Sequence, residues 1–260
     1  MLAFDDKMAV SFDRIANIYD ATRWSGVPPE IMKKLLGAMK ETFASCRTIL
    51  DVGTGTGRFA QYLIDSGFNV VGIDVSLDMM AKAREKNLRN LVQADAHQLP
   101  FRDSTSDGTI MIHVLHLVRD WVQVVGEIGR VTRKVIVAGV EGGEGFSPRL
   151  RYLELRREMG YPLDRFNDGE AGLRRMVPPA IVKLVSDYWT DVDVHEEIDS
   201  FDRRKSSVSW GIPAKVNDRI IHRLHSENPA KTVRRRETVE VVGWDPAQLR
   251  DLSSRGFSSN

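Results

Sequence analysis

Cysteine is nearly absent from the sequence, which holds only Cys46 among its 260 residues. One cysteine cannot close an internal disulfide, and one thiol cannot hold a metal ion by itself. A disulfide-stapled scaffold and a cysteine-based metal centre are therefore excluded. We expect Cys46 to be a small buried residue of the core.

Long apolar runs are also missing, because no stretch approaches the roughly 18 residues needed to cross a bilayer. Residues 1–10 carry Asp5, Asp6 and Lys7 in place of the apolar centre of a secretory signal. Hydrophobic residues make up 42% and charged residues 28% of the chain, which is ordinary for a soluble globular protein. We therefore expect a cytoplasmic protein that has no membrane partner.

An excess of charge of one sign is missing as well, since 37 Lys and Arg residues face 36 Asp and Glu residues and the net charge is +1. A dedicated nucleic-acid binder carries a strong positive field, so we do not expect nucleic acid as a partner. Two short basic clusters, at residues 203–205 and 234–236, are typical of solvated surfaces.

A metal-binding pattern is not evident either. His222 and His225 are spaced i, i+3 on a predicted helix, but no third ligand lies near them in the sequence. We expect both imidazoles to face solvent, and we predict no metal cofactor.

The first half of the chain does show a clear alternation of short apolar runs and amphipathic helices. Apolar runs separated by such helices are typical of a parallel sheet that is covered on both faces. Because crossovers between parallel strands are right-handed, the topology should be a doubly wound α/β sheet. Ser76 is placed to cap the helix after the second strand. Strands are predicted at residues 48–52, 69–74, 91–95, 108–113 and 134–140.

The pattern changes after residues 142–143. Two further strands are expected to join the edge of the sheet, and the helices between them should lie over the carboxyl ends of the strands, where such sheets bind ligands. The helices are predicted over 147–159, about 170–188 with an interruption at Pro178-Pro179, and 213–226, and the strands over 190–198 and 237–243. The predicted regions are a core with N-terminal helices over 1–145, a helical cap that includes strand six over 146–230, and the last strand with a tail over 231–260.

The segment ILDVGTGTGRF, residues 49–59, lies between a predicted strand and a predicted helix, as a nucleotide-binding turn must. Gly53 and Gly55 permit a tight turn and close backbone approach to a ligand. The spacing alone does not exclude NAD, because the dinucleotide pattern counted from Gly55 ends at Ala60, which it tolerates. Asp51 argues against NAD, since a carboxylate in this bend repels a pyrophosphate and favours a cationic ligand such as S-adenosylmethionine.

Residues 51–57, Asp-Val-Gly-Thr-Gly-Thr-Gly, resemble the acidic-x-Gly-x-Gly-x-Gly signature of class I S-adenosylmethionine-dependent methyltransferases. Residues 12–20 are similar to an N-terminal segment of the small-molecule and quinone-type, or methyltransferase-11-like, members. The likeness covers about residues 10–140 and implies a Rossmann-like sheet of order 3-2-1-4-5-7-6 with strand seven antiparallel. Residues 114–120 resemble the family's V-L-H-H-V-x-D segment after strand four, but Leu117 stands where a second histidine is common. Residues 132–134 lack the family's usual Lys-Pro-Gly-Gly turn before strand five.

The resemblance also implies how the cofactor, or its product S-adenosylhomocysteine, would be held. The acid at position 74 would accept both ribose hydroxyls, the acid at position 95 would take the adenine amino group, and the aromatic at position 19 and the base at position 23 would lie near the methionine end. The implied cofactor-binding residues are Tyr19, Arg23, Asp51, Gly53, Thr54, Gly55, Gly57, Asp74, Val75, Met79, Asp95, Ala96 and His113.

Methyl transfer is an in-line displacement that depends mainly on alignment, and a base is needed only where the acceptor must lose a proton. His113 and His116 are the base candidates, of which His116 is the predicted catalytic residue. We expect a small-molecule acceptor. An RNA or protein acceptor remains an alternative, as does a different class, an NAD-dependent oxidoreductase or a non-catalytic nucleotide-binding protein. The residues leave open the methylated atom and the oligomeric state.

Overall fold

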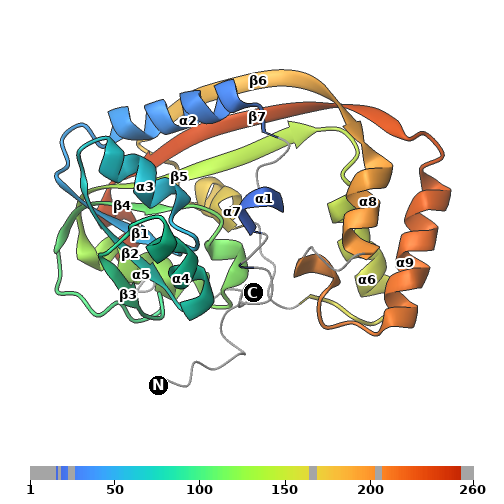
Figure 1. The fold of residues 1–260 in the computed structure, drawn as a ribbon, viewed down its shortest axis with the longest axis horizontal. Helices are drawn as coiled ribbons and strands as arrows, with labels where there is room; N and C mark the ends of the chain where they lie inside the picture. Colours follow the sequence, from blue (N-terminus) through green and yellow to red (C-terminus); the bar gives the residue numbers. More distant parts are fainter. Residues whose placement is uncertain (1–15, 17–18, 23–26, 164–168, 203–206, 253–260) are drawn as a thin grey trace. The chain divides into compact units, whose positions relative to one another are not determined.

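The computed structural model describes residues 16, 19–22, 27–163, 169–202 and 207–252. Its seven strands form one sheet in the order β3-β2-β1-β4-β5-β7-β6, with β7 antiparallel, as the resemblance predicted (Figure 1). Arg23 and most of the N-terminal segment that carries the resemblance lie outside the described residues. The strands are β1 (Thr48–Val52), β2 (Asn69–Asp74), β3 (Leu91–Gln93), β4 (Ser106–Met111), β5 (Thr132–Glu144), β6 (Ile181–Asp193) and β7 (Thr232–Trp244).

The centre of the sheet is parallel, and its register brings the carboxyl ends of three strands together. Asp51 on β1 is opposite Gly72 on β2 and Ile110 on β4. β4 ends at Met111, two residues before the expected end, and His113 then has a φ of 57°. A left-handed residue cannot continue a strand, so the chain turns away from the sheet at this point.

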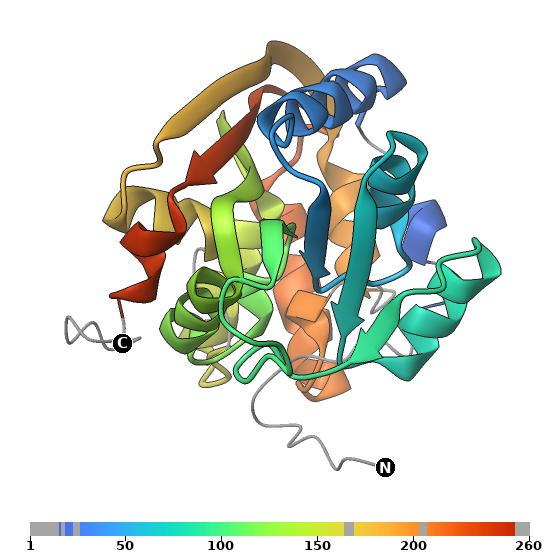
Figure 2. The ribbon, with the colours of Figure 1, turned by 90° about the vertical axis from the view of Figure 1, so that its left-hand side faces the viewer.

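The helix before β1 and the helices that alternate with the central strands, as predicted, lie on both sides of the sheet (Figure 2). Ser76 accepts a hydrogen bond from the Met79 backbone at 3.0 Å and caps the helix after β2, as expected. Cys46 is buried, and its neighbour Phe43 packs over Gly108, where an added Cβ would lie 2.7 Å from the ring. These helices are α2 (Pro29–Thr42), α3 (Arg58–Asp65), α4 (Leu77–Glu85) and α5 (Trp121–Val131).

Residues 170–198 differ from the prediction. The expected long helix ends early, as α7 (Gly169–Met176), and β6 begins at Ile181. Pro178-Pro179 ends the helix because proline lacks an N–H and biases the preceding residue towards extended backbone. The strand expected over 190–198 ends at Asp193, and α8 (Val194–Asp202) follows, with Val194, Ile198 and Phe201 buried at helical spacing.

Two short elements and an additional helix complete the region around the sheet. The 3₁₀ turn η2 (Leu115–Leu117) follows β4, and α1 (Tyr19–Thr22) precedes α2. The chain also contains α10 (Pro246–Arg250), which was not predicted from the sequence. It packs closely on α5, because an added Cβ at Gly129 would lie 2.7 Å from the Arg250 backbone nitrogen.

The chain divides into two compact units. Unit 1 contains residues 1–141, 165–186 and 239–260, and unit 2 contains residues 142–164 and 187–238. Three of the four boundaries fall inside β5, β6 and β7, and the fourth, between residues 164 and 165, lies outside the described residues. Besides the strand segments, unit 2 holds α6 (Pro148–Glu158), α8, η3 (Ser207–Ser209) and α9 (Ala214–Glu227).

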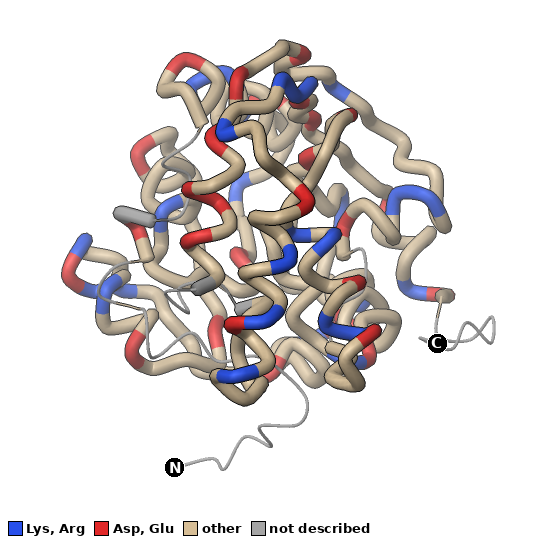
Figure 3. Tube along the Cα trace, turned by 90° about the vertical axis from the view of Figure 1, so that its right-hand side faces the viewer, with Lys and Arg blue, Asp and Glu red and all other residues tan. Residues whose placement is uncertain are grey.

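Unit 2 has its own packed interior and a charged surface. The buried Tyr152 ring lies 5.1 Å from that of Phe201, and its hydroxyl donates to Asn217. On the exposed side, Arg151 pairs with Glu227 at 2.8 Å. Figure 3 shows that acidic and basic positions are interspersed along the chain on this side. None of the helices in the described residues is long and apolar enough to cross a membrane.

Candidate functional site

The bend between β1 and α3 is built from three left-handed glycines. Gly53, Gly55 and Gly57 have φ values of 70°, 54° and 77°, a conformation that only glycine adopts without strain. The bend is also crowded, because an added Cβ at Gly53 would lie 2.5 Å from the Val114 side chain. At Gly57 it would lie 2.6 Å from Leu88, so the third glycine serves packing against the neighbouring loop.

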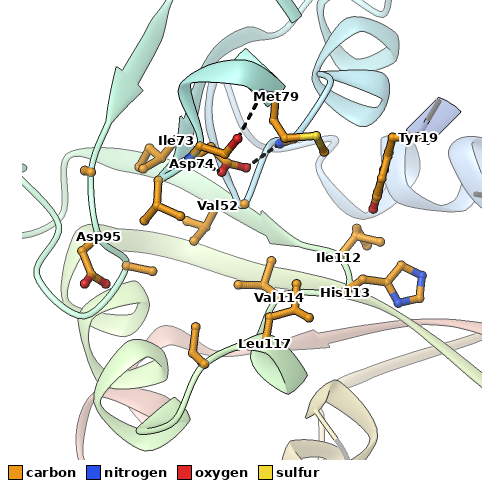
Figure 4. Close-up of a pocket in the computed structure, with 17 residues that line it drawn as sticks. Tyr19, Val52, Ile73, Asp74, Met79, Asp95, Ile112, His113, Val114 and Leu117 are labelled. Atoms are coloured by element: carbon orange, nitrogen blue, oxygen red, sulfur yellow. Dashed lines mark hydrogen bonds between the residues drawn. The ribbon is translucent and has the colours of Figure 1, made fainter. Parts of the chain in front are cut away.

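Asp74, the last residue of β2, binds the glycine bend directly. One carboxylate oxygen accepts from the Gly55 backbone N–H at 2.8 Å, and the other accepts from that of Ser76 at 2.9 Å (Figure 4). The side chain is thus fixed by two loops that both start at the carboxyl end of the sheet.

A cavity opens beside this carboxylate and is lined entirely by unit 1. In Figure 4, Asp95 lies at one end, Tyr19 and His113 lie at the other, and Asp74 lies between them. The expected cofactor residues that line it are Tyr19, Gly53, Gly55, Asp74, Val75, Met79, Asp95, Ala96 and His113. The lining residues that sequence reasoning did not include are Val52, Ile73, Ser76, Ala94, Ile112, Val114, Leu117 and Val118.

Asp51, Thr54 and Gly57 were also expected to bind the cofactor, but they are not among the residues that line the cavity. Asp51 is only 3% exposed and accepts the Thr54 hydroxyl at 2.7 Å. Burial raises the pKa of Asp51 to about 7, and the negative charge of Asp74 adds to this shift, while the Thr54 hydroxyl and the Ala60 backbone oppose it. Asp51 therefore supports the bend from behind.

Asp95 is held by a residue that sequence reasoning did not select. Its carboxylate accepts from the His97 backbone N–H at 2.9 Å and lies 2.6 Å from Nδ1 of the same imidazole. His97 is buried, and it stands two residues after Asp95 in the same loop. A histidine two positions after a predicted ligand was the signal that could have identified it.

The two histidines after β4 have different environments. His113 lines the cavity, and its Nε2 lies 3.4 Å from a carboxylate oxygen of Glu141 on β5. The His116 ring packs edge-on against that of His113, with ring centres 5.9 Å apart, but His116 is not among the lining residues. Its Nδ1 lies 4.0 Å from Glu170. The geometry thus brings His113, rather than the predicted His116, to the cavity.

Glu170 at the start of α7 connects to both histidines and is only 6% exposed. It accepts backbone hydrogen bonds from Val114 at 2.7 Å and Leu115 at 3.3 Å. Burial would raise the pKa of Glu170, but hydrogen bonding to His116, the charges of His116 and His113, and the Val114 N–H together lower it. Glu170 is therefore a buried carboxylate, and no local pattern in the sequence marked it.

Asp20 attaches α1 to the glycine bend and so places Tyr19 beside the cavity. It accepts the Thr56 hydroxyl at 2.6 Å and pairs with Lys86. Lys86 also donates to the Thr56 carbonyl at 2.9 Å. The contact between α1 and the bend is thus a three-residue polar network beside Tyr19.

Comparison with known proteins agrees with this architecture. Residues 50–135 match the family described as a methyltransferase domain. A malonyl-[acyl-carrier protein] O-methyltransferase of Pectobacterium atrosepticum is 33% identical over 131 residues, which are 48% of this chain and 49% of that protein. A demethylmenaquinone methyltransferase of Renibacterium salmoninarum is 29% identical over 148 residues, or 51% and 58%. The chain spans about half the length of these curated relatives.

Among solved structures, the YcgJ protein of Bacillus subtilis superposes with a TM-score of 0.54 at 18% identity, covering 82% of this chain and 98% of that one. At this identity the likeness concerns the fold alone. The family match covers the stretch that holds the glycine bend, Asp74 and Asp95. Over residues 50–135 the chain is therefore similar to the methyltransferase domain family, in agreement with the class I, S-adenosylmethionine-dependent signature that its sequence resembles.

Proposed function

We propose that the protein transfers the methyl group of S-adenosylmethionine to a small-molecule acceptor. The observation that supports this most directly is the charge of the cavity. Two carboxylates, Asp74 and Asp95, lie along it, and the described residues that line it include no lysine or arginine. Such a lining suits a ligand that carries hydroxyl and amino donors and positive charge, and it disfavours a pyrophosphate.

The donors and acceptors fit the cofactor part by part. Asp74 can accept hydrogen bonds from ribose hydroxyls, and Asp95 can accept them from the adenine amino group. Val75 and Ala96 also line the cavity and can supply apolar surface for a ring. An added Cβ at Gly55 would lie 3.2 Å from the Met79 methyl, a tight contact, so the glycine lets the backbone pass close to this side of the cavity.

When bound, S-adenosylmethionine supplies an activated methyl group. The chain's own task is then to hold and orient the reactants and to exclude water, and good alignment is worth about 7–11 kcal/mol of the barrier. Tyr19 and His113 line the end of the cavity away from Asp95, so this end is the place for the reacting groups. In this proposal His113 takes the place of His116 as the residue nearest the chemistry.

The name of one relative, which acts on demethylmenaquinone, supports a small acceptor. The other relative acts on a malonyl-[acyl-carrier protein], in which a small acyl group is attached to a carrier protein. The near balance of charge in this chain gives no support to an RNA acceptor. We assign no particular acceptor, since the similar segments cover only about half of those relatives.

Calorimetric titration of the purified protein with S-adenosylmethionine, S-adenosylhomocysteine and NAD tests the proposal. We expect both sulfur nucleosides to bind and NAD not to bind. Binding of NAD without binding of either nucleoside would refute the proposal. If the nucleosides bind but no labelled methyl group reaches a panel of small alcohols, amines and carboxylic acids, while RNA or protein is labelled, the small-molecule acceptor is wrong.

A further inference from the structure

The turn between β4 and α5 forms one wall of the cavity, and its regular structure is limited to the short 3₁₀ turn η2. Its lining residues are Ile112, His113, Val114, Leu117 and Val118. His113 is held in left-handed backbone, which is costly for a residue with a side chain. A turn of this kind keeps its shape only where the surrounding structure holds it.

Glu170 supplies that support from a distant part of the chain. Its carboxylate accepts the backbone N–H groups of Val114 and Leu115, which follow the end of β4. Gly169 allows the approach, because its φ is 54° and an added Cβ would lie 3.1 Å from the His116 side chain. Helix α7 thus begins against the wall of the cavity, with a buried charge pointed at its backbone.

Movement of this turn would reach the end of the cavity where His113 lies. Val114 packs on Gly53 of the glycine bend, and His113 lies at the end that Tyr19 shares. Asp95 belongs to a different loop at the opposite end. If Asp74 holds the ribose and Asp95 the adenine, the amino-acid tail of the cofactor must extend towards the wall that Glu170 supports.

We propose that Glu170 is a positioning residue for the amino-acid end of the cofactor, acting through the backbone of Val114 and Leu115. The inference rests on the proposed function. It predicts that loss of Glu170 weakens binding of that tail while leaving the nucleoside part almost unaffected.

The test compares S-adenosylhomocysteine with adenosine, which has the same base and ribose but a 5′-hydroxyl in place of the homocysteine tail, by calorimetry on the full chain. We expect Glu170→Ala to weaken S-adenosylhomocysteine about tenfold or more, because the unsupported turn then adopts its binding geometry only part of the time, and to change adenosine by less than about twofold. Glu170→Gln should recover much of the lost affinity, because its amide oxygen still accepts the Val114 N–H. Hydrogen exchange at Val114 and Leu115 should become faster in Glu170→Ala.

Glu127 provides a matched control in the same unit. Its carboxylate accepts the Leu99 backbone N–H at 2.9 Å, and neither residue lines the cavity. Glu127→Ala should lower stability without changing the ratio of the two affinities. If Glu170→Ala does not fold, Glu170→Asp replaces it, since the shorter carboxylate cannot reach both N–H groups.

An unchanged affinity ratio in a folded Glu170 variant, or an equal loss for both ligands, overturns the inference. Failure of the wild-type protein to bind either ligand has a different meaning, because it counts against the proposed function itself.

Discussion

Two buried carboxylates at opposite ends of the parallel sheet have pKa values that are shifted in opposite directions. At the amino end, Asp107 on β4 is 5% exposed and accepts the Arg47 backbone N–H at 2.8 Å and that of Thr48 at 3.1 Å. Arg133 donates to its other oxygen at 2.9 Å. Burial alone would raise the pKa of Asp107, but these donors and Lys134 lower it to about 2.

Near the carboxyl end, Asp51 has a similarly small exposed fraction and its pKa is about 7. Its partners are a hydroxyl and a backbone group, and the charge that acts on it is the negative one of Asp74. Asp51 also lies deeper beneath the surface than Asp107, so both burial and the kind of partner separate the two residues. Cations offset the cost of burial for the Asp107 charge, whereas no cation does so among the described partners of Asp51, so the charged form of Asp51 is disfavoured in the fold.

Removal of the Asp107 carboxylate should change the free energy of unfolding more than any other substitution proposed for these two ends of the sheet. Asp107→Asn leaves two backbone N–H groups and a cation without their anion, and it should lower the free energy of unfolding by about 3–5 kcal/mol at pH 7. Because the folded pKa lies below the ordinary value of 3.8, the contribution is present above about pH 4 and is lost as the pH falls towards 2. Urea unfolding across this range measures it.

Asp103→Asn is the control for that experiment, since Asp103 is 74% exposed and pairs at the surface with Arg130. It should change stability by less than about 1 kcal/mol. Equal losses of stability in Asp107→Asn and Asp103→Asn would show that the buried carboxylate contributes no more than an exposed one.

Neutralising Asp51 should raise the free energy of unfolding, whereas neutralising Asp107 should lower it. The folded pKa is raised, so the stability that Asp51 contributes is complete below about pH 4 and is lost as the pH rises through about 7. Asp51→Asn should therefore gain about 2–4 kcal/mol relative to wild type between pH 4 and pH 8. Parallel stability curves for the two proteins over this range would show that Asp51 titrates normally.

Asp74, at the same end of the sheet, is the proposed contact to the ribose of the cofactor. Asp74→Ala should weaken binding of S-adenosylhomocysteine by about 1–3 kcal/mol, because hydrogen bonds in a buried site are lost. Asp78 is exposed on α4 and gives the matched control, Asp78→Ala, which should bind normally. Calorimetry distinguishes the two, and unchanged affinity in Asp74→Ala would mean that another group holds the ribose.

The smallest expected effect concerns Thr54, whose hydroxyl donates to Asp51. Thr54→Val should cost about 1 kcal/mol at pH 8, where Asp51 is charged. Since the hydroxyl lowers the pKa of Asp51, its removal should move the pH-dependent loss of stability to higher pH. A loss that is the same at pH 5 and pH 8 would argue against this coupling.

Local patterns in the sequence were sufficient for the central sheet and for part of the site. The glycine bend, Asp74 and Asp95 each lie at or just after the end of a strand, so strand prediction alone brings them to one edge. Glu170 could not be found in this way, because its partners lie 55 and 56 positions away and a glutamate in a helical stretch is ordinary. Asp107 was missed for the same reason, since Arg47 is 60 positions from it.

The prediction for residues 170–198 was wrong for a different reason. Ile181 to Asp193 mixes exposed and half-buried positions along its length, as an edge strand does, and the adjoining Val194–Asp202 is helical. A short alternating pattern at this junction fits both the two-residue period of a strand and the 3.6-residue period of a helix, and only the observed burial distinguishes them.

The division into two compact units has a consequence for protein engineering. Unit 2 is interrupted in sequence, and three of its junctions with unit 1 lie within β5, β6 and β7 rather than in a linker. A chimera that exchanges this region with a relative must therefore splice inside hydrogen-bonded ladders, where a one-residue error in register turns every following side chain to the wrong face. Cuts between residues 141 and 142, 186 and 187, and 238 and 239 preserve that register only if the donor strands are aligned residue for residue with β5, β6 and β7.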